Sequence, residues 1–323
     1  MHASAAFFAE VHALDELQLL YSNEKYRELP KWILGGGSNL LLTKDLDCLV
    51  VHIANKGIEV LSETAQDVLV KVSAGEVWHH WVMYAVEHKW FGVENMALIP
   101  GSVGAAPVQN IGAYGCELKD VLYSLEAWNT ETRSLEIFTN DQCKFGYRQS
   151  IFKSVAKGKY IIWAVTFLLN KNGKLNTTYG AIRDVLSAQE IVEPEITDVC
   201  NAVISIRKNK LPDPAQIGNS GSFFKNPEVE LDHFEKIKSA YPLLPSYPSA
   251  LNGKVKMSAA WLIEQCGWKG YRRGDAGCHA LQALVLVNYG NASGAEIWQL
   301  AQDIIKSVHD KFDIQLEPEV NIY

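Results

Sequence analysis

The chain has 323 residues, of which 48% are apolar and 21% charged, so it is long enough for two folded domains and is neither disordered nor a coiled-coil rod. Thirty Lys and Arg against 37 Asp and Glu give a formal net charge of −7, the wrong sign for non-specific binding to nucleic acid or an anionic membrane. No apolar run approaches the ~20 residues of a membrane span, and no export signal is evident, so we expect a cytoplasmic protein.

Apolar spacing predicts helices and strands in the first part of the chain. Helices with one apolar face are predicted at 14–20 and 77–88. Short apolar runs predict strands at 32–34, 48–51 and 68–72. Between residues 91 and 116 neither period persists, and Gly, Pro and small residues dominate.

The second part of the chain mixes both kinds of element. Strands are predicted at 122–128, 135–138, 160–169 and 283–287, and helices at 196–206, 258–266 and 297–308, before an extended segment at 317–321. Leu211-Pro212-Asp213-Pro214 cannot continue a helix, so we place a domain boundary there. The irregular order predicts an α+β fold and not a doubly wound sheet.

Two glycine-rich runs predict a cofactor site. Gly35-Gly36-Gly37-Ser38-Asn39 follows a strand and could cradle a diphosphate, although it lacks the Rossmann spacing and a tight turn is the alternative. The run 99–115 interleaves small residues with Ile, Val and Tyr, which a linker rarely does. The candidate cofactor-binding residues are Gly35, Gly36, Gly37, Ser38, Asn39, Pro100, Gly101, Ser102, Gly104, Gly112 and Gly115.

Three further runs could carry chemistry. Arg148, flanked by aromatic residues, suits a carboxylate or enolate oxygen, with an exposed structural Arg as the alternative. The run 218–227 misses the serine-hydrolase spacing, yet a serine there could donate a proton. Glu317-Pro318-Glu319-Val320 could supply an acid, although a surface Glu is the default. Basic clusters at 207–210 and 269–273 could bind phosphates or be solvated.

Metal and disulfide chemistry are not expected. The six cysteines are far apart and contain no C-x-x-C, which favours scattered, reduced core thiols. His79 and His80 lack a second pair of ligands, so we expect no metal site.

In order and spacing, the runs resemble the UDP-N-acetylenolpyruvoylglucosamine reductase family of flavoenzymes in peptidoglycan synthesis. The matching pieces are ILGGGSNLLL (33–42), ENMALIPGSVGAAPVQNIGAYG (94–115), GYRQSIFK (146–153), KLPDP (210–214), GNSGSFFKNP (218–227), SAAWLIEQCG (258–267), QALVLVN (282–288) and EPEV (317–320). Asn321 stands where the family usually has Arg, and the chain lacks the family's usual Asn-Thr-Phe start.

The resemblance implies a two-lobed FAD-binding domain of the vanillyl-alcohol-oxidase type over 1–209, with lobes of about 1–55 and 56–209. It also implies a C-terminal α+β substrate-binding domain over 210–323, whose last residues return to the active-site cleft. In this family NADPH reduces FAD, and the reduced flavin delivers hydride to C3 of the enolpyruvyl ether. The expected partners are NADPH and UDP-N-acetylenolpyruvoylglucosamine, with the protein a monomer.

Roles carried from the family onto matching positions are as follows. Ser222 would protonate C2, while Arg148 and Glu319 would stabilise the enolate, Glu319 as the neutral acid or an orienting group. The substrate-binding candidates are Tyr147, Tyr179, Lys210, Lys225, Asn226 and Gln282. Tyr179 would lie on the substrate-covering loop of one subgroup. The alternatives are another flavin oxidase of this superfamily and a non-catalytic sugar-nucleotide binder.

Overall fold

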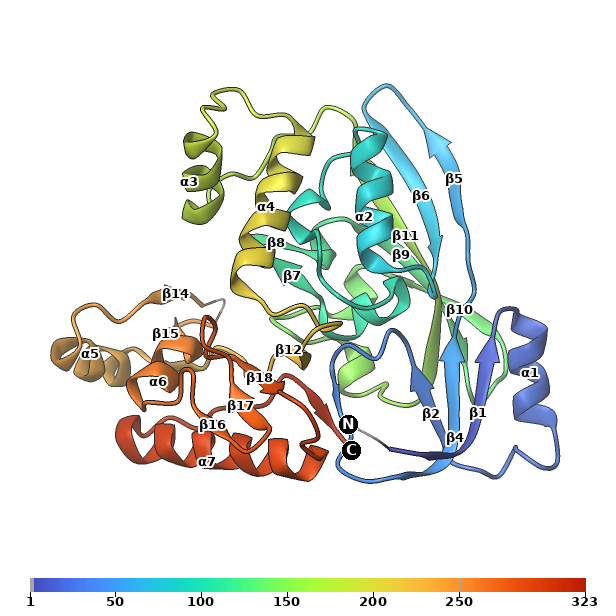
Figure 1. Cartoon of the computed structure of the whole chain (residues 1–323). Coiled ribbons are helices and arrows are strands. Elements are labelled where there is room, and N and C mark those ends of the chain that lie inside the picture. The colour runs from blue at the N-terminus through green and yellow to red at the C-terminus, as the bar shows by residue number, and fades with distance from the viewer. Residues whose placement is uncertain (1–2, 250) are drawn as a thin grey trace. The chain divides into compact units, whose positions relative to one another are not determined.

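The computed structural model describes residues 3–249 and 251–323 and divides into two compact units (Figure 1). The larger unit comprises Ala5–Gly37 and Asp47–Asn209. The smaller unit comprises residues 3–4, Ser38–Leu46 and Lys210–Tyr323. The segment that follows the Gly35–Gly37 run therefore belongs to the smaller unit, although most of its neighbours in sequence belong to the larger one.

A small sheet at the start of the larger unit carries the first glycine run. Its strand order is β1-β4-β2, and β2 (Lys31–Leu34) is parallel to β4 (Leu46–Ile53). Strand β1 (Ala5–Val11) and helix α1 (Leu14–Ser22) complete this part, and Leu17 of α1 is fully buried with Val51 of β4. Gly35 directly follows β2, at the carboxyl end of a parallel strand, where ligands commonly bind.

The second sheet of the larger unit is antiparallel, with strand order β10-β9-β11-β6-β5. Its strands are β5 (Ile58–Glu63), β6 (Asp67–Ser73), β9 (Leu122–Asn129), β10 (Leu135–Thr139) and β11 (Tyr160–Asn170). The central strand β11 is buried over most of its length, as expected of a strand with neighbours on both sides. The predicted strands at 68–72, 122–128, 135–138 and 160–169 are confirmed.

Three helices accompany the sheet: α2 (Trp78–Glu87), α3 (Gly180–Ala188) and α4 (Ile196–Lys210). Apolar side chains of all three share one hydrophobic core with β6, β9 and β11. The stretch from 91 to 116 holds the 3-10 helices η1 (Glu94–Met96) and η2 (Val103–Gln109) and the hairpin β7 (Gly112–Ala113) and β8 (Cys116–Glu117). Three more 3-10 turns are η3 (Leu118–Asp120), η4 (Asp141–Cys143) and η5 (Ile151–Lys153).

The smaller unit is built on short strands. A four-stranded sheet has the order β12-β18-β17-β16, a three-stranded sheet the order β13-β15-β14, and β19 pairs with β3 in parallel. These strands are β3 (Leu40–Leu41), β12 (Gly218–Ser222), β13 (Glu228–Glu230), β14 (Ser246–Pro248), β15 (Lys254–Met257), β16 (Arg272–Arg273), β17 (Ala276–Cys278), β18 (Val285–Asn288) and β19 (Asn321–Ile322).

Helices α5 (Leu231–Ala240), α6 (Ala259–Gln265) and α7 (Gly294–Phe312) surround a core of their own with these strands. Helix α7, red in Figure 1, begins at a capping box in which the Ser293 hydroxyl accepts from the Glu296 N–H and the Glu296 carboxylate accepts from the Ser293 N–H. Its buried face contains Ile297, Leu300 and Ile304, which confirms the predicted helix.

Several elements differ from the sequence prediction. Strand β1 and helices α3 and α5 were not predicted, and the strand expected at 283–287 is β18, Val285–Asn288. Strand β1 is hard to recognise because Phe7 and Phe8 are exposed and adjacent, so they do not follow the alternation of a half-buried strand.

Candidate functional site

The glycine runs of the larger unit bring backbone segments into close contact. A Cβ on Gly35 would lie 2.7 Å from Ser102 Oγ, and one on Gly36 would lie 2.8 Å from Gly101 Cα. A Cβ on Gly104 would lie 2.4 Å from that of Ala74. The carboxyl end of β2 therefore packs on the 101–104 loop without space for side chains, as in a cradle built from backbone.

A cavity of about 160 Å³ lies beside this cradle. Three predicted cofactor residues, Gly35, Ser102 and Gly104, line it. The rest of the lining is mostly apolar and consists of Ile33, Leu34, Ile53, Ala74, Ala105, Val108, Phe152, Tyr160, Ile161 and Ile162. The backbone of the cradle beside an apolar wall that includes Phe152 and Tyr160 suits part of a molecule that joins a diphosphate to a flat ring, as FAD does. The apolar lining residues were not among the sequence candidates, because those on β2, β4 and β11 resemble ordinary core strand residues and others, such as Val108 and Phe152, are apolar members of runs chosen for their glycines or for Arg148.

Two further cofactor candidates, Gly112 and Gly115, lie on the β7–β8 hairpin. Gly115 has a φ of +82°, and a Cβ there would lie 3.0 Å from Asn176 Nδ2, so a side chain would be doubly unfavourable. The buried Asn95 amide holds the hairpin by donating to Tyr114 O at 3.0 Å and to Asn176 O at 2.9 Å. The hairpin and the segment before Tyr179 are therefore fixed to one another.

Arg148 lies at the tip of a tight turn. Gly146 and Gln149 exchange backbone hydrogen bonds of 3.0 and 3.2 Å across it, and Arg148 itself has a φ of +53°, which is unfavourable for a residue with a side chain. The fully buried Asn110 donates to Gly146 O at 3.1 Å and so anchors the turn. The guanidinium lies 5.4 Å from the ring centre of the neighbouring Tyr147.

Arg207, on α4, interacts electrostatically with Tyr114 and Arg148, although it was not a sequence candidate. The Tyr114 ring meets that of Tyr179 edge to face at 5.1 Å. Burial lowers the pKa of Arg207, and the Arg148 charge adds to this while Tyr114 opposes it; burial also raises the pKa of Tyr114. Within the described residues its buried Nε has no partner. Its membership of the basic cluster 207–210 was the available signal.

In the smaller unit, Ser222 ends β12 just after a bulge. Asn219 pairs with Val287 and Ser222 with Val285, so one extra residue is accommodated, and Gly221 has a φ of +71°. The bulge leaves Ser222 exposed to solvent. A proton donor needs this access, because water must return the proton after each turnover.

Glu319 lies on a segment hydrogen-bonded to the chain that follows Ser222. The Glu319 N–H donates to Phe223 O at 2.8 Å, and the Lys225 N–H donates to Glu317 O at 2.9 Å. Phe224 and Pro318 form the β-bridge between them. The segments that carry Ser222 and Glu319 are thus hydrogen-bonded to each other, although almost one hundred residues separate the two in sequence.

Three of the four substrate candidates of this unit lie next to β12 or β18 in sequence. Lys225 Nζ forms a 2.8 Å ion pair with Glu317, and Asn226 Oδ1 accepts from the Ala259 N–H at the start of α6 at 3.0 Å. Gln282 is half-buried in the turn before β18. Lys210 is exposed at the end of α4.

Two predicted cofactor residues, Ser38 and Asn39, fall in the smaller unit. The Asn39 amide Nδ2 donates to Glu319 O at 3.2 Å. Asn39 O in turn accepts from the backbone N–H and the Nδ2 of Asn321, at 3.1 and 3.2 Å. The polar groups of Asn39 are therefore directed to the C-terminal segment in this structure.

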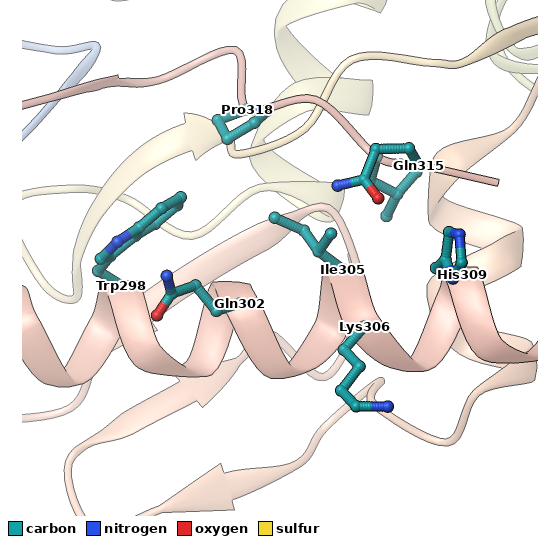
Figure 2. Close-up of a pocket in the computed structure, with 8 residues that line it drawn as sticks. Trp298, Gln302, Ile305, Lys306, His309, Gln315 and Pro318 are labelled. Carbon is teal, nitrogen blue, oxygen red and sulfur yellow. The ribbon is translucent and has the colours of Figure 1, made fainter.

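A separate groove of about 500 Å³ runs between α7 and the segment 315–318 (Figure 2). Trp298, Gln302, Ile305 and His309 on the helix face Gln315 and Pro318, while Lys306 points away from the segment in this view. None of the candidate residues lines the groove, so it is not part of the predicted site.

The cysteines and the possible metal ligands of the described residues bear on whether the chain holds a disulfide or a metal site. The six thiols are free, and burial raises the pKa of Cys143 and Cys278 to about 12. Over residues 3–249 and 251–323, no three His, Cys, Asp or Glu side chains are grouped so as to hold a metal ion. In the same part of the chain, no helix combines the length and apolar character needed to cross a bilayer.

Comparisons with known proteins agree with this architecture. Residues 5–136 match the family model of an FAD binding domain, and residues 213–323 match that of the UDP-N-acetylenolpyruvoylglucosamine reductase C-terminal domain. A crystal structure of UDP-N-acetylenolpyruvylglucosamine reductase from Thermus caldophilus has the same fold, with a TM-score of 0.67, 22% identity, and coverage of 98% of this chain and 91% of that one. The predicted α+β architecture, with an FAD-binding domain and a C-terminal domain, is confirmed.

Curated relatives are similar over the whole chain. UDP-N-acetylenolpyruvoylglucosamine reductase of Flavobacterium johnsoniae is 50% identical, covering 100% of this chain and 95% of the relative. The proteins of the same name from Pseudomonas fluorescens and Amoebophilus asiaticus are each 48% identical, over 100% and 99% of this chain and 95% and 94% of theirs. The chain belongs to the UDP-N-acetylenolpyruvoylglucosamine reductase family.

Proposed function

We propose that this protein reduces UDP-N-acetylenolpyruvoylglucosamine to UDP-N-acetylmuramate with FAD and NADPH, a step of peptidoglycan precursor synthesis. Full-length similarity to reductases of that name supports the reaction. The observation that carries it is the hydrogen-bonded pair of segments on which Ser222 and Glu319 lie, joined by the 2.8 Å bond from Glu319 N–H to Phe223 O. This pairing supports a site in which Ser222 would donate a proton and Glu319 would act as an acid, as reduction of an enolpyruvyl ether requires.

The residues proposed to hold FAD are the backbone cradle and the hairpin glycines. Gly35, Gly36 and Gly37 with Pro100–Gly104 would meet the diphosphate, and Gly112 and Gly115 would allow backbone to approach the ring system. Ser38 and Asn39 are retained in the proposal as the end of the same loop. When bound, FAD supplies the redox chemistry, passing a hydride from NADPH to C3 of the substrate.

Addition at C3 places negative charge on the substrate carboxylate as an enolate. Arg148 carries a permanent positive charge and would bind these oxygens, with Glu319 acting as the neutral acid or an orienting group, because an ionised carboxylate would repel them. Ser222 would transfer its hydroxyl proton to C2, which completes the saturated lactyl ether, and solvent would return the proton to the exposed serine.

The remaining candidates are proposed to bind the sugar nucleotide. Tyr147, Tyr179, Lys210, Lys225, Asn226 and Gln282 supply hydrogen-bonding groups and two positive charges, which suits a diphosphate and a carboxylate. Tyr179 is the N-cap residue directly before α3 and is 40% exposed, so its side chain is accessible to a ligand, as the proposed subgroup requires.

We also propose that residues 1–209 bind FAD and residues 210–323 bind substrate, and that the protein acts as a cytoplasmic monomer without nucleic-acid or membrane partners. The match of residues 5–136 to an FAD binding domain supports the first assignment, and the net charge of −7 supports the last.

The test is an absorbance spectrum of the purified protein, followed by an assay of NADPH oxidation. We expect a flavin spectrum, and NADPH oxidation that depends on UDP-N-acetylenolpyruvoylglucosamine. A colourless protein that takes up no FAD would contradict the proposal. Rapid reoxidation by oxygen with a hydroxylated substrate, and none with the enolpyruvyl ether, would favour a flavin oxidase instead.

A further inference from the structure

Residues 39 and 40 are hydrogen-bonded to both segments that carry the proposed proton chemistry. The Asn39 amide donates to Glu319 O at 3.2 Å. The Ser220 hydroxyl, two residues before Ser222, donates to Leu40 O at 2.7 Å. One short segment therefore contacts the strand of the proton donor and the segment of the acid, and all of these residues belong to the smaller unit.

These contacts close into a ring. Glu319 N–H donates to Phe223 O at 2.8 Å, which joins the two segments directly. Asn321 pairs with Leu40 in the parallel β3–β19 ladder and donates to Asn39 O through both its backbone and its amide. We call Asn39, Leu40, Ser220 and Glu319 the 39–40 clasp.

The bulge in β12 explains why such a ring would matter. Between Asn219 and Ser222 the ladder to β18 is interrupted, so Ser220 and Gly221 are not held by regular strand pairing. A glycine with a φ of +71° adds backbone freedom directly before Ser222. The bond from the Ser220 hydroxyl to Leu40 O supplies the constraint that the ladder omits at this point.

We propose that Ser220 is a positioning residue that, through the 39–40 clasp, holds Ser222 and Glu319 in register for proton transfer to C2. The inference rests on the proposed function, because it concerns the second half-reaction, in which reduced enzyme meets the enolpyruvyl ether. Proton transfer depends steeply on geometry, and a displacement of ~1 Å can cost up to ~10²-fold in rate.

The test compares Ser220→Ala with wild type in the two half-reactions. We expect flavin reduction by NADPH to be unchanged and reoxidation by UDP-N-acetylenolpyruvoylglucosamine to slow by about tenfold or more. The solvent deuterium isotope effect on reoxidation should rise, because proton transfer becomes slower relative to the other steps.

Two further variants separate positioning from simple loss of stability. Ser220→Thr keeps the hydroxyl and should restore most of the reoxidation rate. Ser239→Ala removes a hydroxyl that donates to Lys236 O, also at 2.7 Å, but on the exposed surface of α5, and should leave both half-reactions unchanged. FAD content and the melting temperature would be measured for every variant.

The outcomes distinguish the two proposals. If wild type does not turn over the substrate, the proposed function fails. If wild type turns over and Ser220→Ala reoxidises at the same rate, or slows equally in both half-reactions, the positioning role is wrong. A slow Ser220→Ala enzyme without a rise in the isotope effect, and without rescue by Ser220→Thr, would also overturn it.

Discussion

The Nη2 of Arg148 donates to the backbone oxygen of Gly112 at 3.0 Å, which joins the arginine turn to the β7–β8 hairpin. Asn110 stabilises the turn that holds Arg148 in a left-handed conformation, because its amide donates to Gly146 O. A strained residue held in this way by its surroundings often marks a functional site.

Replacing the Arg148 guanidinium by an ammonium group tests whether its positive charge alone is enough or whether its forked hydrogen-bonding geometry is also needed. Arg148→Lys keeps the positive charge and the unfavourable φ but loses the fork, so we expect reoxidation by the substrate to slow by ~10²-fold. Arg133→Lys is a matched control, because Arg133 has a φ of +58° but lies exposed in the turn after β9. The half-reaction rates of both variants decide the matter, and equal rates for Arg148→Lys and wild type would remove Arg148 from the mechanism.

The glycine cradle predicts a specific loss of cofactor. Gly104→Ala would place a Cβ 2.4 Å from that of Ala74, so the 101–104 loop must move, at a cost of ~1–3 kcal/mol in unfolding free energy and with weaker FAD binding. Gly180→Ala meets no atom within 4 Å and should keep full FAD content. The ratio of flavin to protein absorbance measures the effect, and normal FAD content in Gly104→Ala would refute the cradle.

Asn110 should matter for stability through its hydrogen bonds. Its side chain is fully buried and bonds to Gly146 O, Glu117 and the Lys119 N–H. Asn110→Ala leaves these groups unpaired and places alanine at a φ of +45°, so we expect a loss of ~2–4 kcal/mol in denaturant unfolding.

An exposed asparagine provides the comparison. Asn172→Ala removes a single amide bond, to Ala65 O at 3.3 Å on the surface, and should change the unfolding free energy by less than ~1 kcal/mol. Similar losses in the two variants would show that Asn110 does not anchor the turn.

The buried thiols predict how stability depends on pH. Burial raises the pKa of Cys143 and Cys278 from 9.0 to about 12, so in the folded protein these thiols stay neutral where an unfolded chain would ionise. The stability that they contribute is complete below pH 9 and is lost as the pH rises towards 12. Urea unfolding between pH 8 and 11 measures this; Cys143→Ala should reduce the slope, and an unchanged slope would contradict the assignment.

Much of this arrangement could be predicted from the sequence. Long periodic segments such as β11 and α7 were recognisable because tertiary packing reinforces their local pattern. The glycine runs indicated close backbone approach, and Gly35 and Gly104 do pack with no room for a side chain. The periodic segments and the glycine runs could be recognised because both depend on the types of residues that are close together in the sequence.

Other parts could not be predicted because they depend on contacts between distant residues. The 39–40 clasp joins residues about 280 positions apart, and no local pattern shows that Asn39 donates to Glu319 O. The bulge before Ser222 arises from pairing with β18, so the sequence gives only its glycine. Arg207 was recognised only as one member of a charged cluster, and its burial, which lowers its pKa, distinguishes it from the exposed Lys208 and Lys210 beside it.

The proton donor itself is tested most directly by Ser222→Ala, measured in the two half-reactions with purified FAD-loaded enzyme. The account predicts unchanged reduction of the flavin by NADPH and reoxidation by UDP-N-acetylenolpyruvoylglucosamine that is slower by at least ~10²-fold. An equal loss in both half-reactions would mean that Ser222 is structural, and a normal rate of reoxidation would mean that the proton comes from another group.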